Sequence, residues 1–387
     1  MLLSRRATLQ ALTAAVLATP VVARSADPFR IGTVLSVTGP AAFLGQDMKD
    51  GAQLAVEQIN LSGGIDGREV EWIFHDAQSE TQRAINDTRK LLTSDRVDII
   101  VGGGSMSGIA LAMSAMCEQA KVPFISTEGA AGIVAPVAQH RWSFKSTVDD
   151  DLAMQRLADY FDKRGIQRIA LLADTSGFGQ SATEQLRAVA SARGLSLTAL
   201  SFSPGDTDLV PQLTAAREAK AQAIICWTVT PAGLVFLKQA QQLALHEQAT
   251  LIHGYGFVAN RYMELAGNAA DPLLLLSQKF VVGDELPDND PVRQPILALD
   301  KAFRERWNRA PNQFVAQTYD AVQMARTALA QGGKDREKVR QALEAIHGLR
   351  LASGVFDFSP DRHAGLSKQN LVLVSWRGGR FHLADYT

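Results

Sequence analysis

The sequence predicts an α/β protein with two wound parallel sheets, each covered by helices on both faces. Short apolar runs alternate with amphipathic stretches of helical length, which is typical of parallel sheets. This alternation starts again near residue 145. The chain has 387 residues, of which 46% are hydrophobic and 20% charged, enough for two separate cores. The composition excludes disorder, collagen and coiled coils.

The first wound unit is predicted between residues 29 and 126. The run Gly45 to Asn60 carries apolar residues such as Met48 and Ile59 at helical spacing, and Ser62-Gly63-Gly64 follows as a helix stop. The same reasoning predicts strands over 29–37, 69–74, 97–101 and 122–126, and helices over 45–60, 84–92 and 109–120.

A second unit is predicted from about residue 150, followed by a helical block and a β tail. Its elements are helices 152–163, 181–193, 209–219 and 232–243, and strands 168–173, 195–202, 223–228 and 250–255. The tail comprises helices 292–307, 314–330 and 336–345, and strands 354–358, 371–376 and 380–383. This order suits two lobes joined by several chain crossings.

The first 26 residues have the layout of an export signal. Arg5 and Arg6 precede an apolar and small-residue stretch, and no acidic residue occurs before Asp27. The Ser-Arg-Arg sequence is similar to a twin-arginine motif, and the general secretory route is the alternative. We expect cleavage near Ala23 or Ser25 and a periplasmic mature protein. The stretch is shorter than the ~20 apolar residues that span a bilayer, and no other segment reaches that length.

Charge and side-chain counts exclude several functional classes. The net charge is −1, so nucleic acid is not expected as a partner. Seven histidines show no paired metal-ligand spacing, and we expect no metal and no cofactor. Cys117 and Cys226 lie in different units, and we expect both to be free, buried thiols.

The most informative motif is the loop Gly102–Gly108, which follows a strand and opens a helix. Backbone N–H groups and the helix dipole at such a place can hold a carboxylate or phosphate, although a glycine turn chosen for tight packing is the alternative. The stretch 174–179 repeats this arrangement in the second unit. Ligands of wound sheets bind beyond the carboxyl ends of strands. Residues expected there are Leu44, Ser105, Glu128, Phe178, Trp227 and Tyr255.

An enzyme would need a base held near a nucleophile. The nearest candidate base is His253, beside Tyr255, and a core or rim histidine is its commoner role. No P-loop and no nucleophile elbow is present. Catalysis is therefore not predicted, and a secreted α/β enzyme stays as an alternative of a different class.

Several stretches in order resemble the periplasmic substrate-binding proteins of branched-chain amino acid ABC transporters, over nearly the whole mature chain. The matching stretches are Ile31–Gly45, Gly51–Asn60, Gly63–Gly67, His75-Asp76, Ser105, Phe178-Gly179 and Tyr319–Val322. The resemblance implies two Rossmann-like lobes of type I joined by three strands, with a ligand in the cleft and closure by hinge bending. It also implies a membrane permease as partner, and we expect a monomer.

The resemblance implies lobes of 27–145 plus 281–352 and of 146–280 plus 353–387, with the ligand between them. We expect the ligand to contact eleven residues, namely Phe43, Leu44, Ser105, Met106, Ser107, Thr127, Glu128, Ala130, Phe178, Trp227 and Tyr255. In the family a Ser hydroxyl and backbone N–H groups bind the ligand carboxylate, a role that fits Ser105 with the amides near Ser107.

This sequence departs from the family pattern at the ammonium subsite. Ala130 stands where the family has Thr, and Tyr255 stands where it has an acidic residue. A buried ammonium without partners costs several kcal/mol, about 3–5, so an organic acid with an apolar or aromatic body is favoured. Glu128 would rescue an aliphatic amino acid, the first alternative, and amides or urea are the second. A sensor role is a further reading.

Overall fold

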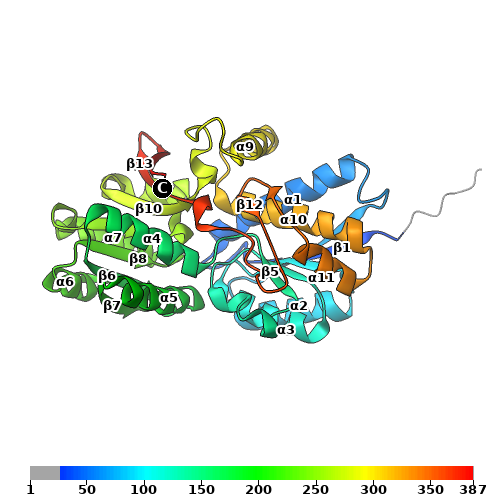
Figure 1. Cartoon of the computed structure of the whole chain (residues 1–387), viewed down its shortest axis with the longest axis horizontal. Helices are drawn as coiled ribbons and strands as arrows, with labels where there is room; N and C mark the ends of the chain where they lie inside the picture. The colour runs from blue at the N-terminus through cyan, green and yellow to red at the C-terminus, as the bar shows by residue number, and fades with distance from the viewer. Residues whose placement is uncertain (1–26, 387) are drawn as a thin grey trace, which may run out of the picture.

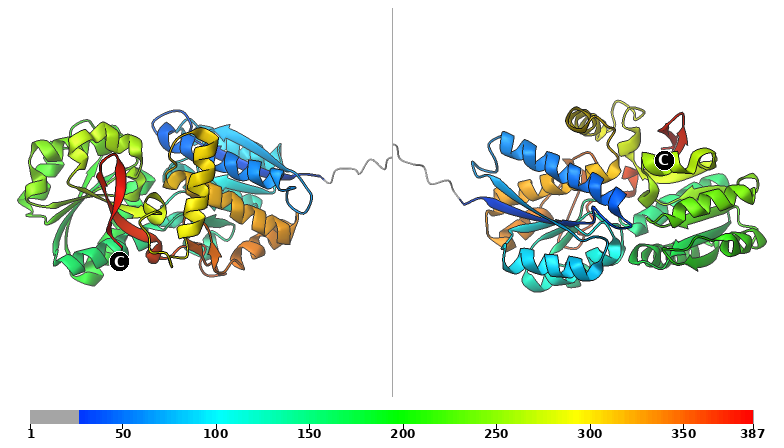
Figure 2. Two further views of the ribbon diagram at one scale, coloured as in Figure 1. Left: turned by 90° about the horizontal axis from the view of Figure 1, so that it is seen from above. Right: turned by 180° about the vertical axis from the view of Figure 1, so that it is seen from behind.

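The computed structural model describes residues 27–386, so the predicted export signal lies outside the described residues. Two groups of strands and helices lie side by side and form two lobes (Figure 1). The views from above and from behind keep the same two groups apart (Figure 2). None of the helices in the described range is long and apolar enough to cross a membrane.

The first lobe is built on a five-stranded sheet in which every pair is parallel. Its order is β2-β1-β3-β4-β5, with β1 (Phe29–Leu35), β2 (Val70–Asp76), β3 (Ile99–Gly102), β4 (Phe124–Ser126) and β5 (Ser143–Lys145). The helices around it are α1 (Ala42–Leu61), α2 (Thr81–Thr93), α3 (Ser107–Ala120), α10 (Gln313–Gly332) and α11 (Arg336–Glu344).

Alternation along β3 shows how both faces of this sheet are covered. Ile99 and Val101 belong to one core cluster with alanines of α1 and α10, whereas Ile100 belongs to another with residues of α2 and α3. Side chains of a strand point to opposite faces in turn, so a continuous apolar run fits a sheet buried on both sides. The predicted α/β class with two lobes is confirmed.

The second lobe is built on a seven-stranded sheet of order β14-β13-β10-β9-β8-β6-β7. Five strands are parallel, and the last two are added as an antiparallel hairpin. They are β6 (Arg168–Asp174), β7 (Ser196–Phe202), β8 (Ala223–Trp227), β9 (Thr250–His253), β10 (Leu273–Gln278), β13 (Leu371–Arg377) and β14 (Arg380–Asp385). Its helices are α4 (Asp150–Arg164), α5 (Gly177–Arg193), α6 (Val210–Glu218), α7 (Ala232–Gln242) and α8 (Asn260–Ala266).

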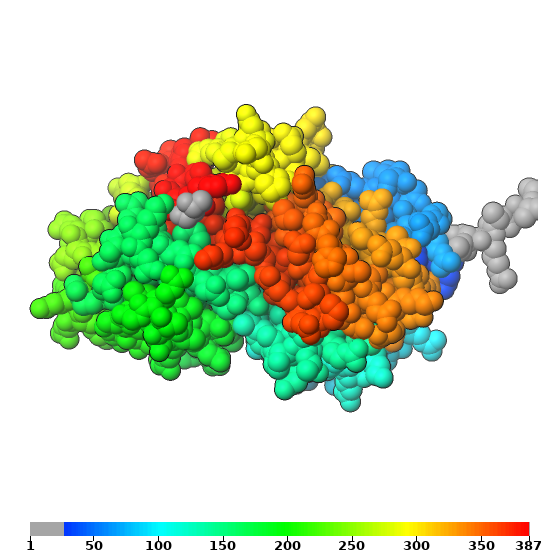
Figure 3. All heavy atoms as spheres, in the orientation of Figure 1, coloured from blue at the N-terminus to red at the C-terminus, as the bar shows by residue number. Residues whose placement is uncertain are grey.

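The chain passes between the sheets three times: after β5, after β10, and between the short strand β12 (Val355–Phe356) and β13. The first two crossings are tied where Gln278 Nε2 donates to Thr147 Oγ1 at 3.2 Å. The turn that leads into β12, before the third crossing, is held by Asp320 of α10, whose carboxylate accepts the N–H groups of Ala352 and Ser353. On the face in Figure 3 the segment after α11 runs across the junction of the lobes.

Three strands of the structure, β5, β10 and β11 (Leu349–Arg350), and one helix, α8, have no counterpart in the sequence prediction. β5 is a strand of three residues. β10 begins with the apolar run Leu273–Leu276, for which the sequence analysis predicts no strand. α8 has seven residues. α9 (Arg293–Trp307) and α10 match their predicted ranges, and β11 pairs with β12. The lobe boundaries at 145, 280 and 352 stay a prediction.

Candidate functional site

A cavity of about 220 Å³ lies between the two lobes, beyond the carboxyl ends of their strands. Loops after β3, β4, β6, β8 and β9 contribute to its wall, as do α1 and α10. A wound sheet binds ligands at this edge because the strand ends splay there and leave a crevice. A site with walls from both lobes can also respond to their relative movement.

Eight of the eleven residues expected at the ligand line this cavity: Leu44, Ser105, Met106, Ser107, Thr127, Glu128, Phe178 and Tyr255. The other three lie outside its lining. The ring of Phe43 packs edge-on against Tyr262 at 4.3 Å between centroids. Trp227 is completely buried, and Ala130 is 1% exposed.

The first turns of α3 and α5 meet at the cavity, one from each lobe. Ser107 and Gly108 of α3 line it together with Gly177 and Phe178 of α5. A Cβ atom added at Gly177 would lie only 3.1 Å from the Gly108 nitrogen, so the two turns are in contact. The opening N–H groups of a helix lack intrahelical acceptors and carry the positive end of the helix dipole. Two such ends at one cavity favour an anion.

Ser105 directs the chain into α3 through an unusual backbone conformation. Its φ of 61° lies in the left-handed region, and its hydroxyl accepts the Ser36 N–H at 3.2 Å. This strained conformation is rare outside glycine and occurs mainly where the surroundings impose it. The Ser36 hydroxyl in turn donates to the Gly104 carbonyl at 2.7 Å. The predicted anion loop is thus held in place by contacts with the loop after β1.

Glu128 is 6% exposed, and donors surround its carboxylate. It accepts the Ser126 hydroxyl at 3.0 Å, the Thr127 hydroxyl at 2.8 Å and the Thr127 N–H at 3.2 Å. The Ser105 N–H donates to it as well. Burial raises the pKa of Glu128 to about 7, and these donors oppose that shift. Because a carboxylate has about four acceptor sites, four donors leave no free site for a ligand ammonium.

Tyr255, at the start of the 3₁₀ turn η4 (Tyr255–Phe257), closes one end of the cavity. Its hydroxyl donates to Asp150 Oδ1 at 2.5 Å. Burial raises the pKa of Asp150 to about 6. A Cβ atom at Gly129 would lie 1.7 Å from the Tyr255 hydroxyl, so this contact depends on glycine. The position expected to hold an acidic residue therefore holds a phenol that is bound to an acidic residue behind it.

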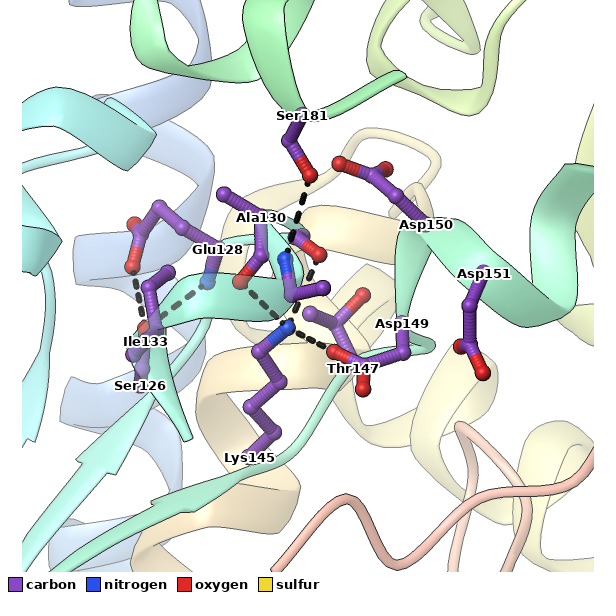
Figure 4. A network of polar contacts seen from close by, with 12 residues as sticks. Ser126, Glu128, Ala130, Ile133, Lys145, Thr147, Asp149, Asp150, Asp151 and Ser181 are labelled. Carbon is purple, nitrogen blue, oxygen red and sulfur yellow. Dashed lines mark hydrogen bonds and ion pairs between the residues drawn. The ribbon is translucent and has the colours of Figure 1, made fainter. Parts of the chain in front are cut away.

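A buried lysine supports the turn under this end of the cavity (Figure 4). Lys145 is 0% exposed, and its Nζ donates to the carbonyl oxygens of Gly129 and Ala130, each at 2.8 Å. Its third partner is the carboxylate of Asp149. On the far side of the turn the Ala131 N–H donates to Ser181 of α5 at 3.2 Å, a contact between the two lobes.

Three aromatic rings form a cluster at the second lobe's side of the cavity. Phe178 and Tyr255 line it, with 5.4 Å between ring centroids. Trp227 packs behind both at 5.3 Å. Such rings favour edge-to-face or offset contacts with a further aromatic ring. Trp227, predicted as a contact residue, therefore supports the two rings that line the cavity.

The structure adds lining residues that sequence reasoning missed. A search after strands finds the first turns of the helices that follow them, but not the side chains that lie further along a helix. Met48 comes from α1, and Gln317 comes from α10. Ser79, Val229 and Gly256 lie on loops after strands whose predicted ends differ from the observed ends by one or two residues. The lining residues beyond the eleven expected at the ligand are Met48, Ser79, Thr81, Gly108, Ile109, Gly129, Ser176, Gly177, Val229, Gly256, Phe314 and Gln317.

His253 and the cysteines lie away from the cavity wall. His253 is fully buried and stacks on Phe257 at 4.1 Å, and burial lowers its pKa to about 3. Cys117 and Cys226 are free and buried, as predicted, and burial raises the pKa of both thiols. Among residues 27–386 no group of three His, Cys, Asp or Glu side chains could hold a metal ion.

Comparisons with known proteins agree with this architecture. Residues 28–380 match the family model described as periplasmic binding protein. Similar relatives are the Leu/Ile/Val-binding protein BraC3 of Rhizobium johnstonii, 24% identical over 98% of this chain and 100% of that protein, and Leu/Ile/Val-binding protein homolog 3 of Brucella melitensis, 24% identical over 90% of this chain and 92% of that protein.

Two solved structures show the same fold. An extracellular ligand-binding receptor from Rhodopseudomonas palustris has a TM-score of 0.84 at 22% identity, covering 92% of this chain and 100% of that chain. A branched-chain amino acid substrate-binding protein from Streptococcus pneumoniae, solved with isoleucine, has a TM-score of 0.78 at 24% identity, covering 93% and 99%. By its match to the family model over almost its whole length, this chain belongs to the periplasmic binding protein family.

Proposed function

We propose that this chain is the extracytoplasmic solute-binding component of an ABC importer. Its ligand is a small organic acid with an apolar or aromatic body, held in the cavity between the lobes after hinge closure. The observation that carries this proposal is the meeting of the first turns of α3 and α5, from different lobes, at one cavity. A carboxylate bound there interacts with both lobes at once and favours the closed arrangement.

The size and wall of the cavity support an apolar or aromatic body. A dry cavity of about 150 Å³ holds benzene, and this one has about 220 Å³. Its wall includes the apolar side chains of Leu44, Met48 and Val229 beside the rings of Phe178 and Tyr255. A ring placed between aliphatic and aromatic walls gains both burial and ring contacts.

The acidic groups near the cavity support a ligand without an ammonium group. The acceptor sites of Glu128 are filled by Ser126, Thr127 and the Ser105 N–H. Asp150 does not line the cavity, and its Oδ1 accepts the Tyr255 hydroxyl. An ammonium in this cavity would lose its hydration without gaining a free carboxylate, a cost of several kcal/mol, about 3–5.

A branched-chain amino acid is the second candidate. The names of similar relatives state Leu/Ile/Val binding, and one structural neighbour was solved with isoleucine. Glu128 does line the cavity, and it becomes the ammonium partner if Ser126 or Thr127 turns its hydroxyl away. An amide or urea would bind in the same cavity but would place no negative charge at the helix ends.

The remaining parts of the proposal concern location and assembly. We propose export by residues 1–26, a periplasmic monomer, and lobes divided as 27–145 plus 281–352 and 146–280 plus 353–387. The family membership supports this division, as do the crossings near Thr147 and Gln278. The partner in transport is a membrane permease, which receives the ligand from the closed protein.

Isothermal titration of the mature protein with four related ligands tests the proposal. Phenylacetate against phenylacetamide isolates the carboxylate, and phenylacetate against L-phenylglycine isolates the ammonium. L-leucine represents the second candidate. We expect the acid to bind at least tenfold more tightly than either phenyl analogue, because one charge-assisted hydrogen bond contributes about 1.5–3 kcal/mol. Stronger binding of L-leucine than of every acid overturns the organic-acid proposal.

A matched pair of variants tests the role of the aromatic wall. Phe178 lines the cavity, whereas Phe43 packs against Tyr262 outside it. Phe178→Leu should weaken phenylacetate binding by about 3- to 10-fold, since a ring pair contributes about 0.5–1.5 kcal/mol. Phe43→Leu should leave it within about twofold. Equal effects of both variants would contradict the placement of the ligand beside Phe178.

A further inference from the structure

A second, outer cavity of about 400 Å³ adjoins the inner one in the cleft. It also has walls from both lobes, with Pro40 and Ser79 on one side and the loops after β7 and β8 on the other. Ser79 and Met106 line both cavities. The two spaces are therefore neighbours with a shared wall.

The shared wall is an adaptable one. Met106 is half-buried and directly precedes α3, so its side chain stands beside the turn that we assign to the ligand carboxylate. Methionine is unbranched and fills irregular gaps in several conformations. A ligand held by its carboxylate at α3 can thus pass Met106 without displacing any backbone segment.

The outer cavity is apolar where a ligand would enter it. Three of its four polar side chains make local contacts: Ser79 accepts the Ala41 N–H at 3.1 Å, and Asp206 accepts the Ser203 N–H at 2.8 Å. Thr230 is hydrogen-bonded to Thr228. The apolar residues of the wall are Pro40, Met106, Pro204, Pro231, Ala232 and Val235. These apolar residues suit an uncharged hydrocarbon group.

We infer that the physiological ligand is an elongated carboxylic acid whose apolar end passes Met106 into the outer cavity. This inference rests on the proposed function and adds the ligand's length and the chemistry of its far end. The carboxylate stays at the first turns of α3 and α5, and an aryl-alkyl or straight alkyl tail occupies the space between Pro40 and Val235.

A homologous series of acids measures the length directly. We would titrate the mature protein with phenylacetate, 3-phenylpropanoate, 4-phenylbutanoate and 6-phenylhexanoate, and with hexanoate and octanoate as alkyl counterparts. Affinity should rise by up to about fourfold per methylene while the tail is being buried. The aryl and alkyl arms show which kind of tail fits better. A steep fall in affinity beyond phenylacetate in the aryl arm, with no gain in the alkyl arm, would overturn the inference.

Two neighbouring variants on α7 provide a matched control. Val235 and Leu234 are both half-buried, but only Val235 lines the outer cavity. Val235→Trp should weaken 6-phenylhexanoate by at least tenfold and leave phenylacetate within about twofold. Leu234→Trp should leave the ratio of the two affinities unchanged, and melting curves of both variants show whether they fold. An equal change of that ratio in both variants would contradict a tail in the outer cavity.

The series also separates this inference from the proposed function. If phenylacetate binds and the longer acids do not, the inference of an elongated ligand is wrong and the proposed organic-acid function still holds. If none of the acids binds, the proposed function is wrong and the inference falls with it.

Discussion

Replacing Lys145 by methionine tests whether a buried cation supports the floor of the cavity. The lysine is 0% exposed, and its Nζ bonds the carbonyls of Gly129 and Ala130 and the carboxylate of Asp149. Methionine has a similar length but no charge, so Asp149 and both carbonyls would lose their partner. Breaking a buried ion pair on one side costs about 3–5 kcal/mol. We expect a loss of that size in the free energy of unfolding.

The assay is urea unfolding followed by tryptophan fluorescence, with three variants beside the natural chain. Lys145→Met combined with Asp149→Asn should recover at least about 1 kcal/mol, because the uncompensated negative charge is gone. Lys301→Met removes an exposed lysine whose partner Glu305 is 3.9 Å away, and it should change stability by less than about 1 kcal/mol. A loss below about 1 kcal/mol for Lys145→Met, with an unchanged unfolding slope, would refute the argument.

Three further outcomes follow from the site and the core. Burial raises the pKa of Glu128 from 4.5 to about 7, so the folded protein keeps this proton to a higher pH than the unfolded chain does. The free energy of unfolding should therefore fall by about 3 kcal/mol from pH 4.5 to 7. Glu128→Gln should flatten that fall in pH-dependent unfolding curves. Gly103→Ala should weaken ligand binding and lower the melting temperature, because its Cβ would lie 1.8 Å from Glu128 Oε2. Gly108→Ala is the control: no heavy atom lies within 4 Å of its Cβ, and its melting temperature should be unchanged. Cys117 and Cys226 should resist alkylation in the folded protein and both react after unfolding, as intact mass would show; a single labelled thiol without reductant after unfolding would contradict this.

Most of the fold could be predicted because its helices and central strands repeat a strong pattern. The helix predicted over 314–330 corresponds to α10, and the strand predicted over 195–202 to β7. β5 was not predicted because three residues are too few to show an alternating pattern. Its strand conformation is stabilised by pairing with β4. β10 escaped for a different reason: its apolar run is short, and only its place between β9 and β13 makes it a strand.

Only the part of the site that lies directly after strand ends could be predicted from the sequence. Ser105 and Phe178 were found because loops after strands at a wound sheet's edge meet there. Gln317 was not found, since it belongs to a helix that returns to the cavity after a long excursion of the chain. Trp227 ends a strand as expected, but its ring packs behind Phe178 and Tyr255. Position after a strand places a residue near the edge and leaves the direction of its side chain open.

The division of the site between the lobes links the fold to capture of a ligand. Neither lobe alone encloses the cavity: α3 brings Ser107 from the first lobe, and α5 brings Phe178 from the second. The crossing segments join the lobes near Thr147 and Gln278. In the proposed function, a ligand that touches both helix ends contributes its full binding energy only in the closed arrangement, and its binding shifts the population toward closure. Recognition and closure are then one event, and we expect the chemistry at the two helix ends to decide which solute triggers it.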